Sequence, residues 1–404
     1  MKNKAKMLVF LCCFVYFASY VTRINFATVI AEIVSAEGFL KSDLSIVVLV
    51  NSLSYGIGQI LTGKMGDRFN PVNIIFAGLL TTIVCNSFIP VCQGIGLMTV
   101  VWMVNGFAQA MMWPPMVRIL STYLNDEEYS KATSDVSVSA SLGRIAVYLF
   151  APFIINVFEW RGVFLVSAAV GIITAVMWKI CMPKIEKSLV PIVQAEKKEQ
   201  KTETRYSIAK VFIGFGLVFV CLAIGFQGYI RDGIDTWLPS IISEVFKTEA
   251  SSAILLSVVL PLISVFGLKV FAFMQRKWFK NELHFAAGLF LCCMALSIVW
   301  IFTYNKNVIL AVMIPALISA IIHGVNFMLT CLVPRRFMFT GRISQISGML
   351  NFSTYIGSAV ASYGTAKLAE TLGWNFAIPV WSIAAILGVL SCVTASGIIT
   401  KKLK

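Results

Sequence analysis

Long segments without charged residues are the feature that most limits what this chain can fold into. Residues 83–104 and 285–304 contain no Asp, Glu, Lys or Arg. Each reaches the length of about 20 residues that a helix needs to cross the hydrocarbon core of a bilayer. Of all 404 residues, 58% are apolar and only 13% are charged. A soluble domain carries about 25% charged residues, so the composition indicates an integral membrane protein.

The apolar segments predict an all-α membrane protein with twelve transmembrane helices in two halves of six. The expected spans are residues 7–34, 43–63, 72–91, 95–123, 131–157, 161–182, 207–241, 250–274, 284–304, 307–332, 342–369 and 374–399. The only long polar stretch, residues 183–206, is predicted to be a cytoplasmic linker. We therefore expect an N-terminal half at residues 1–182 and a C-terminal half at residues 207–404, an architecture typical of transporters.

Basic residues in the connections predict the orientation. The chain has 33 Lys and Arg against 19 Asp and Glu, a formal net charge of +14. The basic residues collect before the first span, after the second, sixth, eighth and tenth spans, and at the C-terminus, whereas residues 125–128 after the fourth span are acidic. Because cytoplasmic loops are rich in Lys and Arg, both termini are predicted to be cytoplasmic. The same distribution argues against nucleic-acid binding, which needs a basic patch on one exposed face.

Nothing in the residue pattern indicates an enzyme. The sequence has no Walker loop, no metal-ligand cluster and no nucleophile–base arrangement, and its two histidines are His284, near a loop, and His323, in a span. Most of the ten cysteines lie in apolar segments, where they are typically small packing residues. We expect no catalytic residue, no metal and no cofactor.

Two arginines lie within apolar spans. Arg23 is in the first span of the N-terminal half, and Arg231 is in the first span of the C-terminal half. A charge deep in a membrane helix costs at least about 2.5–3.5 kcal/mol, so such a residue usually faces the bundle interior or a water-filled cavity. Counting along each span also permits the side chain to extend to the outer interface. A guanidinium group keeps its charge in a dry site and binds phosphate oxygens bidentately.

A short motif follows the second span. It reads Gly63-Lys64-Met65-Gly66-Asp67-Arg68 and resembles the G-x-x-x-D-R loop signature of the major facilitator superfamily. The resemblance implies a gating motif of Gly63, Gly66, Asp67 and Arg68. The glycines would allow close helix approach, and the charged residues would join ion pairs or a helix end that break during transport. The corresponding place in the second half, residues 272–277, keeps basic residues and lacks the acid.

Further motifs narrow the resemblance to one family. They are residues 20–26, residues 105–115 with Arg118, residues 159–161 and residues 229–239. These segments are similar to those of the organophosphate:phosphate antiporter family, which includes bacterial glycerol-3-phosphate and hexose-phosphate transporters, and the resemblance covers nearly the whole chain. It implies an antiporter of the bacterial inner-membrane type. Such a protein exchanges a phosphorylated metabolite for inorganic phosphate by alternating access.

By this resemblance, Arg23 and Arg231 correspond to the two family arginines that bind phosphate. A bound anion would neutralise both and lower the free-energy cost of closing the cavity, whereas an empty carrier would keep uncompensated charge and close slowly. We state this route to obligatory exchange as a hypothesis. The implied partners are a small organic anion (a phosphate ester), inorganic phosphate and membrane lipid, and the family default is a monomer.

Several other residues are candidate substrate-binding positions, each with a structural alternative. Tyr16 and Tyr20 lie seven and three residues before Arg23, which brings them close to its helix face, or they pack in the core. Gln59, Gln109 and Trp113 are candidate cavity residues, although the Trp-Pro-Pro sequence fits a kinked helix equally well.

The second half contributes a candidate polar wall. Its members are His323, Asn326, Asn351 and Tyr355. Each of them fits an interhelical hydrogen bond equally well.

Departures from the family pattern bear on the substrate. Phosphate transporters of the family often carry a lysine where this chain has Gln59 and a histidine near Ala140, and some carry a lysine at Ile24. Arg144, one turn past Ala140, either restores a positive charge to the cavity or pairs with Asp135 on the same span. These changes argue against a direct transfer of glycerol-3-phosphate specificity.

Two other functions stay open as alternatives. A proton- or sodium-coupled organic-anion symporter could use Asp232 and Asp235, which closely follow Arg231. The second alternative is a transporter-like membrane sensor of sugar phosphates, because some relatives of the family act in that way.

Overall fold

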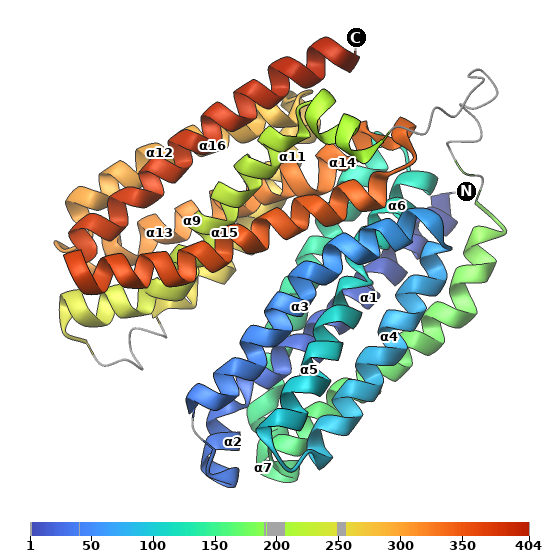
Figure 1. Cartoon of the computed structure of the whole chain (residues 1–404), viewed down its shortest axis with the longest axis horizontal. Coiled ribbons are helices and arrows are strands. Elements are labelled where there is room, and N and C mark those ends of the chain that lie inside the picture. Colours follow the sequence, from blue (N-terminus) through green and yellow to red (C-terminus); the bar gives the residue numbers. More distant parts are fainter. Residues whose placement is uncertain (1, 40, 190, 192–206, 249–255, 404) are drawn as a thin grey trace. The chain divides into compact units, whose positions relative to one another are not determined.

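All regular structure in the described residues is helical (Figure 1). The computed structural model describes residues 2–39, 41–189, 191, 207–248 and 256–403. The α-helices are α1 (Lys2–Thr28), α2 (Ile30–Glu37), α3 (Lys41–Arg68), α4 (Pro71–Phe88), α5 (Ile95–Ala110), α6 (Trp113–Tyr123), α7 (Asp126–Glu186), α9 (Leu217–Phe246), α11 (Val259–Trp278), α12 (Glu282–Thr303), α13 (Val308–Asn326), α14 (Val333–Arg336), α15 (Ile343–Leu372) and α16 (Trp374–Leu403). Short 3₁₀ turns lie at η1 (Ile89–Val91) and η4 (Met338–Thr340), and π-helical turns at η2 (Lys210–Gly214) and η3 (Phe327–Leu332).

The helices correspond to the twelve expected spans, of which the eighth, residues 250–274, begins with residues 250–255 that lie outside the described residues. Ten helical segments of the described residues are long and apolar enough to cross a membrane. One of them, α7, has 61 residues, which at 1.5 Å per residue is about 90 Å and far exceeds one hydrocarbon core of about 30 Å. Non-helical backbone at Glu159 (φ 57°, ψ −173°) divides α7 into two helices. The 30-residue α15, which is not among the ten, supplies the remaining span.

The fourth expected span, residues 95–123, is broken in the middle. Helix α5 ends at Ala110 and α6 begins at Trp113. The two prolines after Trp113 occupy the first turn of α6, where the backbone N–H groups have no intrahelical acceptor and proline is tolerated. The Trp-Pro-Pro sequence therefore begins a new helix.

The expected linker is described only in part. Helix α7 continues to Glu186, four residues into the predicted range 183–206. Residue 190 and residues 192–206 of that range lie outside the described residues.

The chain divides into two compact units. Unit 1 contains Met1–Glu203 and Arg342–Gly348, and unit 2 contains Thr204–Gly341 and Met349–Lys404. In unit 1, α7 packs along α1 and α4, and α5 packs along α3 and α4. In unit 2, α9 packs against α13 and α16, α12 along α16, and α11 along α13. The first turn of α15 therefore belongs to unit 1, and the rest of α15 belongs to unit 2.

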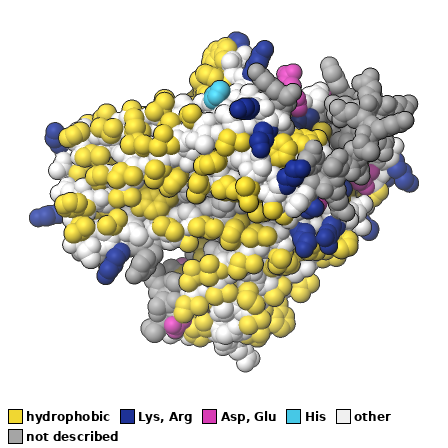
Figure 2. Space-filling view, turned by 45° about the horizontal axis from the view of Figure 1, so that its top comes forward, with side chains coloured by type: hydrophobic (Ala, Val, Ile, Leu, Met, Phe, Trp, Pro, Cys, Tyr) yellow, Lys and Arg dark blue, Asp and Glu magenta, His cyan; other side chains and the backbone are white. Residues whose placement is uncertain are grey.

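The surface of these helices is apolar, whereas polar groups lie inside. Phe153, Val157 and Phe266 are 71%, 70% and 73% exposed, and Figure 2 shows hydrophobic side chains over most of the face that it draws. Gln59 and Gln109, in contrast, are 0% and 2% exposed. Lipid solvates an apolar surface, and buried polar side chains can hydrogen-bond between membrane helices. This distribution is therefore the one expected for a protein within a bilayer.

Candidate functional site

Arg23 lies between two tyrosine rings in unit 1. Its Cζ is 4.4 Å from the ring centroid of Tyr20, which precedes it by three residues on α1, and 4.5 Å from that of Tyr55 on α3. Tyr55 is buried, with 6% of its surface exposed. A guanidinium group within about 6 Å of a ring centroid is attracted by the negative face of the ring. The two rings therefore hold this charge in a defined place inside the helix bundle.

Arg144 reaches the same tyrosine from α7. Its Cζ is 5.9 Å from the ring centroid of Tyr20. The adjacent residue, Gly143, permits this approach, because a Cβ atom there would lie 2.6 Å from the carbonyl oxygen of Phe17 on α1. Two guanidinium groups thus face one tyrosine.

Aromatic side chains extend the wall around Arg23. The ring of Tyr16 lies 5.5 Å from that of Tyr20 and 5.1 Å from that of Trp113, centroid to centroid. Trp113 is 3% exposed, and its indole N–H has no hydrogen-bond acceptor among the described residues. Unit 1 therefore brings Tyr16, Tyr20, Arg23, Trp113 and Arg144 together, and their role in substrate binding stays a prediction.

Gln109 has hydrogen-bond partners within unit 1. Its Nε2 donates to Oγ1 of Thr22 and to Oγ1 of Thr82, at 2.9 Å each. Thr82 in turn donates to Oδ1 of Asn105, whose Nδ2 donates to the carbonyl oxygen of Thr22. This buried network joins α1, α4 and α5 at the residue next to Arg23. Its local role is to fix α1, and a direct contact of Gln109 with substrate stays a prediction.

Gln59 lies on α3 in the same unit and is fully buried. Neither atom of its amide group has a hydrogen-bond partner among the described residues. A buried amide without a partner is energetically unfavourable, by about 1–3 kcal/mol in proteins. The residue therefore offers a donor and an acceptor that the described side chains leave unsatisfied.

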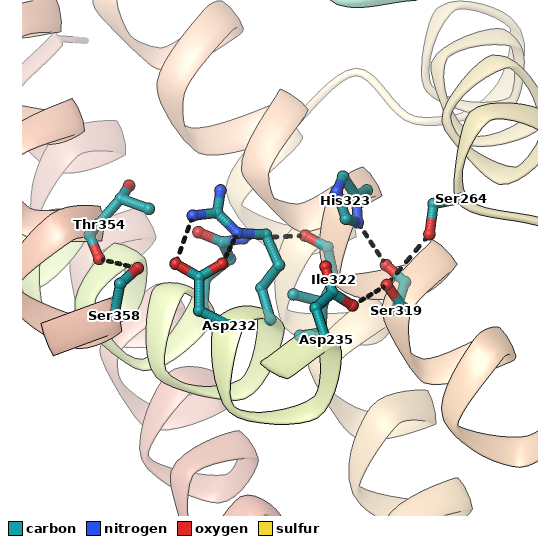
Figure 3. A network of polar contacts seen from close by, with 10 residues as sticks. Asp232, Asp235, Ser264, Ser319, Ile322, His323, Thr354 and Ser358 are labelled. Atoms are coloured by element: carbon teal, nitrogen blue, oxygen red, sulfur yellow. Dashed lines mark hydrogen bonds and ion pairs between the residues drawn. The ribbon is translucent and has the colours of Figure 1, made fainter. Parts of the chain in front are cut away.

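In unit 2, Arg231 lies at the middle of α9 and forms an ion pair with its neighbour. Its Nε donates to Oδ1 of Asp232 at 2.6 Å, and its Nη2 donates to Oδ2 at 3.0 Å. The two side chains are 19% and 28% exposed. Asp232 thus occupies the fork of the guanidinium group with both carboxylate oxygens, as Figure 3 shows. Asp235 and Tyr355 also interact with Arg231 electrostatically.

A second polar chain continues from Asp235 (Figure 3). Its Oδ1 accepts a hydrogen bond from Oγ of Ser319 on α13 at 3.0 Å, and Oγ of Ser264 on α11 donates to Oγ of Ser319 at 3.1 Å. Nδ1 of His323 lies 2.8 Å from the carbonyl oxygen of Ser319. Since a carbonyl oxygen can only accept, Nδ1 is the donor. His323 also interacts electrostatically with both Asp232 and Asp235.

The remaining candidates of the second wall lie on other parts of unit 2. Tyr355 on α15 belongs to the group around Arg231, and Asn351, four residues earlier on the same helix, is half-buried. Asn326 is the last residue of α13. Arg23 and Arg231 belong to different units, so their joint binding of one phosphate stays a prediction.

The predicted gating motif contacts the first turn of α15 inside unit 1. Oδ1 and Oδ2 of Asp67 accept hydrogen bonds from the backbone N–H groups of Ser344 and Gln345, at 2.9 and 2.8 Å. A Cβ atom on Gly63 would lie 2.9 Å from the carbonyl oxygen of Ser344, and one on Gly66 would collide with the side chain of Ser344. The glycines and Asp67 therefore bind a helix N-terminus, where a carboxylate is favoured.

Arg68 and Arg118 have different surroundings at this end of unit 1. Arg68 is exposed. Arg118 donates to the carbonyl oxygen of Gly66 and, at 3.2 Å, to that of Phe69, so it holds the C-terminal end of α3. The motif, expected in a loop, lies in this last part of the helix. The gating role of all four motif residues stays a prediction.

Two features of the site were missed from the sequence. Tyr55 was not a candidate, although it lies four residues before Gln59 and thus on the same face of α3. The ion pair between Arg231 and Asp232 was also not anticipated, because consecutive residues on a helix do not usually face one another.

Comparisons with known proteins agree in the family and in the fold. The family model described as Major Facilitator Superfamily matches residues 12–362. A probable hexose phosphate transport protein of Chlamydia muridarum is 23% identical over 397 residues, which cover 90% of this chain and 84% of the relative. A glycerol-3-phosphate transporter of Bacillus subtilis is 23% identical over 400 residues, which cover 92% and 88%. The crystal structure of the transporter FucP in the outward conformation superimposes with a TM-score of 0.76 at 12% identity, covering 97% of this chain and 99% of that one.

Proposed function

This chain belongs to the Major Facilitator Superfamily, and we propose that it exchanges a phosphorylated metabolite for inorganic phosphate across the membrane. It is a multi-pass protein of the cell membrane. The named activities of the two relatives, hexose phosphate transport and glycerol-3-phosphate transport, support a phosphate ester as the substrate. The likeness to FucP concerns the fold alone.

The observation that carries the proposal is the pair of guanidinium groups at Tyr20. Arg23 and Arg144 lie 4.4 and 5.9 Å from the same ring centroid. Two like charges in a region of low dielectric repel each other, and a doubly charged anion between them replaces that repulsion by attraction. A phosphate group has the charge and the oxygen geometry that guanidinium donors match. Sugars without a phosphate group lack both.

The aromatic wall would supply the rest of the substrate site. Tyr16 packs against Tyr20 and Trp113, and these ring faces and polar edges suit the carbon skeleton and hydroxyl groups of a phosphorylated metabolite. Alternating access would then move the bound anion from one side of the membrane to the other.

The proposal is tested by exchange in proteoliposomes. Vesicles loaded with inorganic phosphate receive labelled phosphate outside, with a panel of hexose phosphates and glycerol phosphates as competitors and protein-free vesicles as the blank. We expect exchange that phosphate esters inhibit and that the unphosphorylated sugars do not. The Arg144→Lys variant keeps the charge and loses the planar fork, so its exchange should fall at least tenfold.

Two outcomes would point to the other functions. Uptake driven by a proton or sodium gradient, without any exchange of internal for external phosphate, would indicate a symporter. Binding of phosphate esters by folded protein without exchange under any gradient would indicate a sensor. Inhibition by sugars as strong as that by their phosphates would contradict an anion site at Arg23 and Arg144.

A further inference from the structure

The middle of α9 carries more negative than positive charge. Asp232 and Asp235 lie three residues apart on α9, and Arg231 is the permanent cation beside them. Among the described residues, the other titratable groups that interact with these three are His323 on α13 and Tyr355 on α15. With a neutral imidazole the group has a net charge of −1, and one added proton makes it neutral. Because an uncompensated charge inside a bilayer is unfavourable by several kcal/mol, this group favours binding a proton.

The hydrogen bonds around His323 define where a proton can bind. Nδ1 of His323 donates to the carbonyl oxygen of Ser319, so Nε2 is the basic nitrogen of the neutral ring. The hydroxyl of the same serine donates to Asp235. One residue of α13 thus orients both the imidazole and the carboxylate.

Asp232 occupies the position that a phosphate group would take at Arg231. It uses both guanidinium N–H groups that point toward it, at 2.6 and 3.0 Å. A phosphate that binds Arg231 through the same fork must displace this carboxylate. The displaced carboxylate of Asp232 would then lie beside two other anions, Asp235 and the phosphate group. No further cation would balance the charge of Asp232 unless this carboxylate takes up a proton.

Two unsatisfied acceptors lie on the same helices as the charged cluster. Oε1 of Gln227, one turn before Arg231 on α9, has no hydrogen-bond partner among the described residues, and neither does Oγ1 of Thr354, which precedes Tyr355 on α15. Both side chains are buried, at 0% and 2% exposure. A buried acceptor without a donor is unfavourable by about 1–3 kcal/mol.

We propose that Asp232, Asp235 and His323 form a proton-binding site, and that a phosphate group binds to Arg231 together with a proton at this site. The inference rests on the proposed function, because it requires a phosphate anion at Arg231. The proton comes from the aqueous side to which the cavity is open and is released on the other side with the anion. In the empty carrier Asp232 stays paired with Arg231, so the group carries less negative charge than it does with a bound anion and needs the proton less, and the carrier can return without a counter-substrate. A pH gradient then drives net uptake in addition to exchange.

The test compares two transport modes in the same vesicles. Inorganic phosphate is the probe, and the membrane potential is held at zero with potassium and valinomycin. Exchange is measured at equal pH with phosphate inside, and net uptake is measured without internal phosphate at an outside pH one unit lower. One proton per anion corresponds to about tenfold accumulation for one pH unit. For the wild type we expect gradient-driven uptake on this scale.

Asp235→Asn and His323→Gln should each lower the ratio of gradient-driven uptake to exchange at least fivefold. Glu244→Gln is the matched control, because Glu244 is a carboxylate of the same helix that accepts a hydrogen bond from Trp374 outside the cluster; its ratio should equal that of the wild type. If the phosphate itself carries the proton, gradient-driven uptake persists in all variants. An unchanged ratio of uptake to exchange in both Asp235→Asn and His323→Gln therefore overturns the inference. If one of the two variants does not fold, the ratio of gradient-driven uptake to exchange in the other variant tests the inference: a fall of at least fivefold supports it, and an unchanged ratio overturns it.

The two possible failures are distinguishable. Exchange by the wild type with an unchanged ratio in the variants would overturn the proton site alone. Absence of phosphate exchange in the wild type would overturn the proposed function and the coupling that depends on it.

Discussion

Replacement of Tyr55 tests how Arg23 is held. In Tyr55→Leu the guanidinium group loses one of its two ring faces, whereas Tyr55→Phe keeps the face and removes only the hydroxyl. Because Tyr55 is 6% exposed, the interaction takes place in a largely dry region. Its contribution should therefore lie in the upper part of the range for cation–π contacts, about 1–2 kcal/mol.

This free energy converts directly into affinity. If the ring fixes Arg23 in the orientation that binds the anion, its loss should weaken phosphate binding by a factor of about 5 to 30. Tyr55→Phe should change the dissociation constant by less than about threefold, which is within 0.7 kcal/mol. Both substitutions are made at the same buried position of α3. The thermal stability of each variant is therefore measured as a control for a general effect on packing.

The dissociation constant is measured with purified protein in detergent by titration with inorganic phosphate, using intrinsic tryptophan fluorescence. Trp113 lies within the aromatic wall that includes Tyr16, so binding near Arg23 should change its emission. Equal losses of affinity in Tyr55→Leu and Tyr55→Phe would show that the hydroxyl, and not the ring face, matters. An unchanged affinity in Tyr55→Leu would refute the idea that this ring positions Arg23.

Three further changes test other contacts of unit 1 through the free energy of unfolding in mixed micelles. Asp67→Asn keeps one acceptor for two backbone N–H groups and loses the negative charge at a helix N-terminus, so we expect a loss of about 1–3 kcal/mol; a loss below about 0.5 kcal/mol would contradict it. Gln109→Leu removes two buried interhelical hydrogen bonds, with an expected loss of about 1–3 kcal/mol, and an equal or higher stability would show that the network is dispensable. Gly143→Val places a side chain against the backbone of α1 and should destabilise by about 1–3 kcal/mol or more, whereas Gly288→Val, where an added Cβ meets nothing within 4 Å, should not.

The fold could be predicted from the sequence because the bilayer restricts the possibilities. Apolar segments of about 20 residues must form helices that satisfy their own backbone hydrogen bonds, and the lengths of the segments give their number. The break at Glu159 was predicted as well, because it lies between the expected spans 131–157 and 161–182. Its backbone conformation, φ 57°, was not predicted. The break before Trp113 lies inside the expected span 95–123, where the Trp-Pro-Pro sequence fitted a kink equally well.

The candidate site could be predicted only for residues that are unusual in a membrane helix. A buried arginine is costly in lipid, so Arg23 and Arg231 stand out in the sequence. Tyr55 does not, because a tyrosine in an apolar helix is ordinarily a packing residue. Its role depends on the way α3 and α1 pack, which a single sequence does not contain. The partners of Gln109 come from α1 and α4 and depend on tertiary packing in the same way.

The charge balance of the second unit changes one of the hypotheses drawn from the sequence. The sequence suggests an empty carrier with uncompensated arginines and hence obligatory exchange. In the structure Arg231 is already paired with Asp232, so the empty second unit does not carry the isolated cation that this hypothesis requires.

The most direct test of the central claim is exchange of labelled inorganic phosphate by Arg23→Lys in proteoliposomes. Arg161→Lys serves as the matched control, since Arg161 pairs with Glu37 at 2.7 Å, away from the tyrosines that hold Arg23. The account predicts that Arg23→Lys loses at least nine-tenths of the exchange rate while Arg161→Lys keeps most of it. Exchange by Arg23→Lys at the wild-type rate would contradict the assignment of a phosphate-binding role to Arg23.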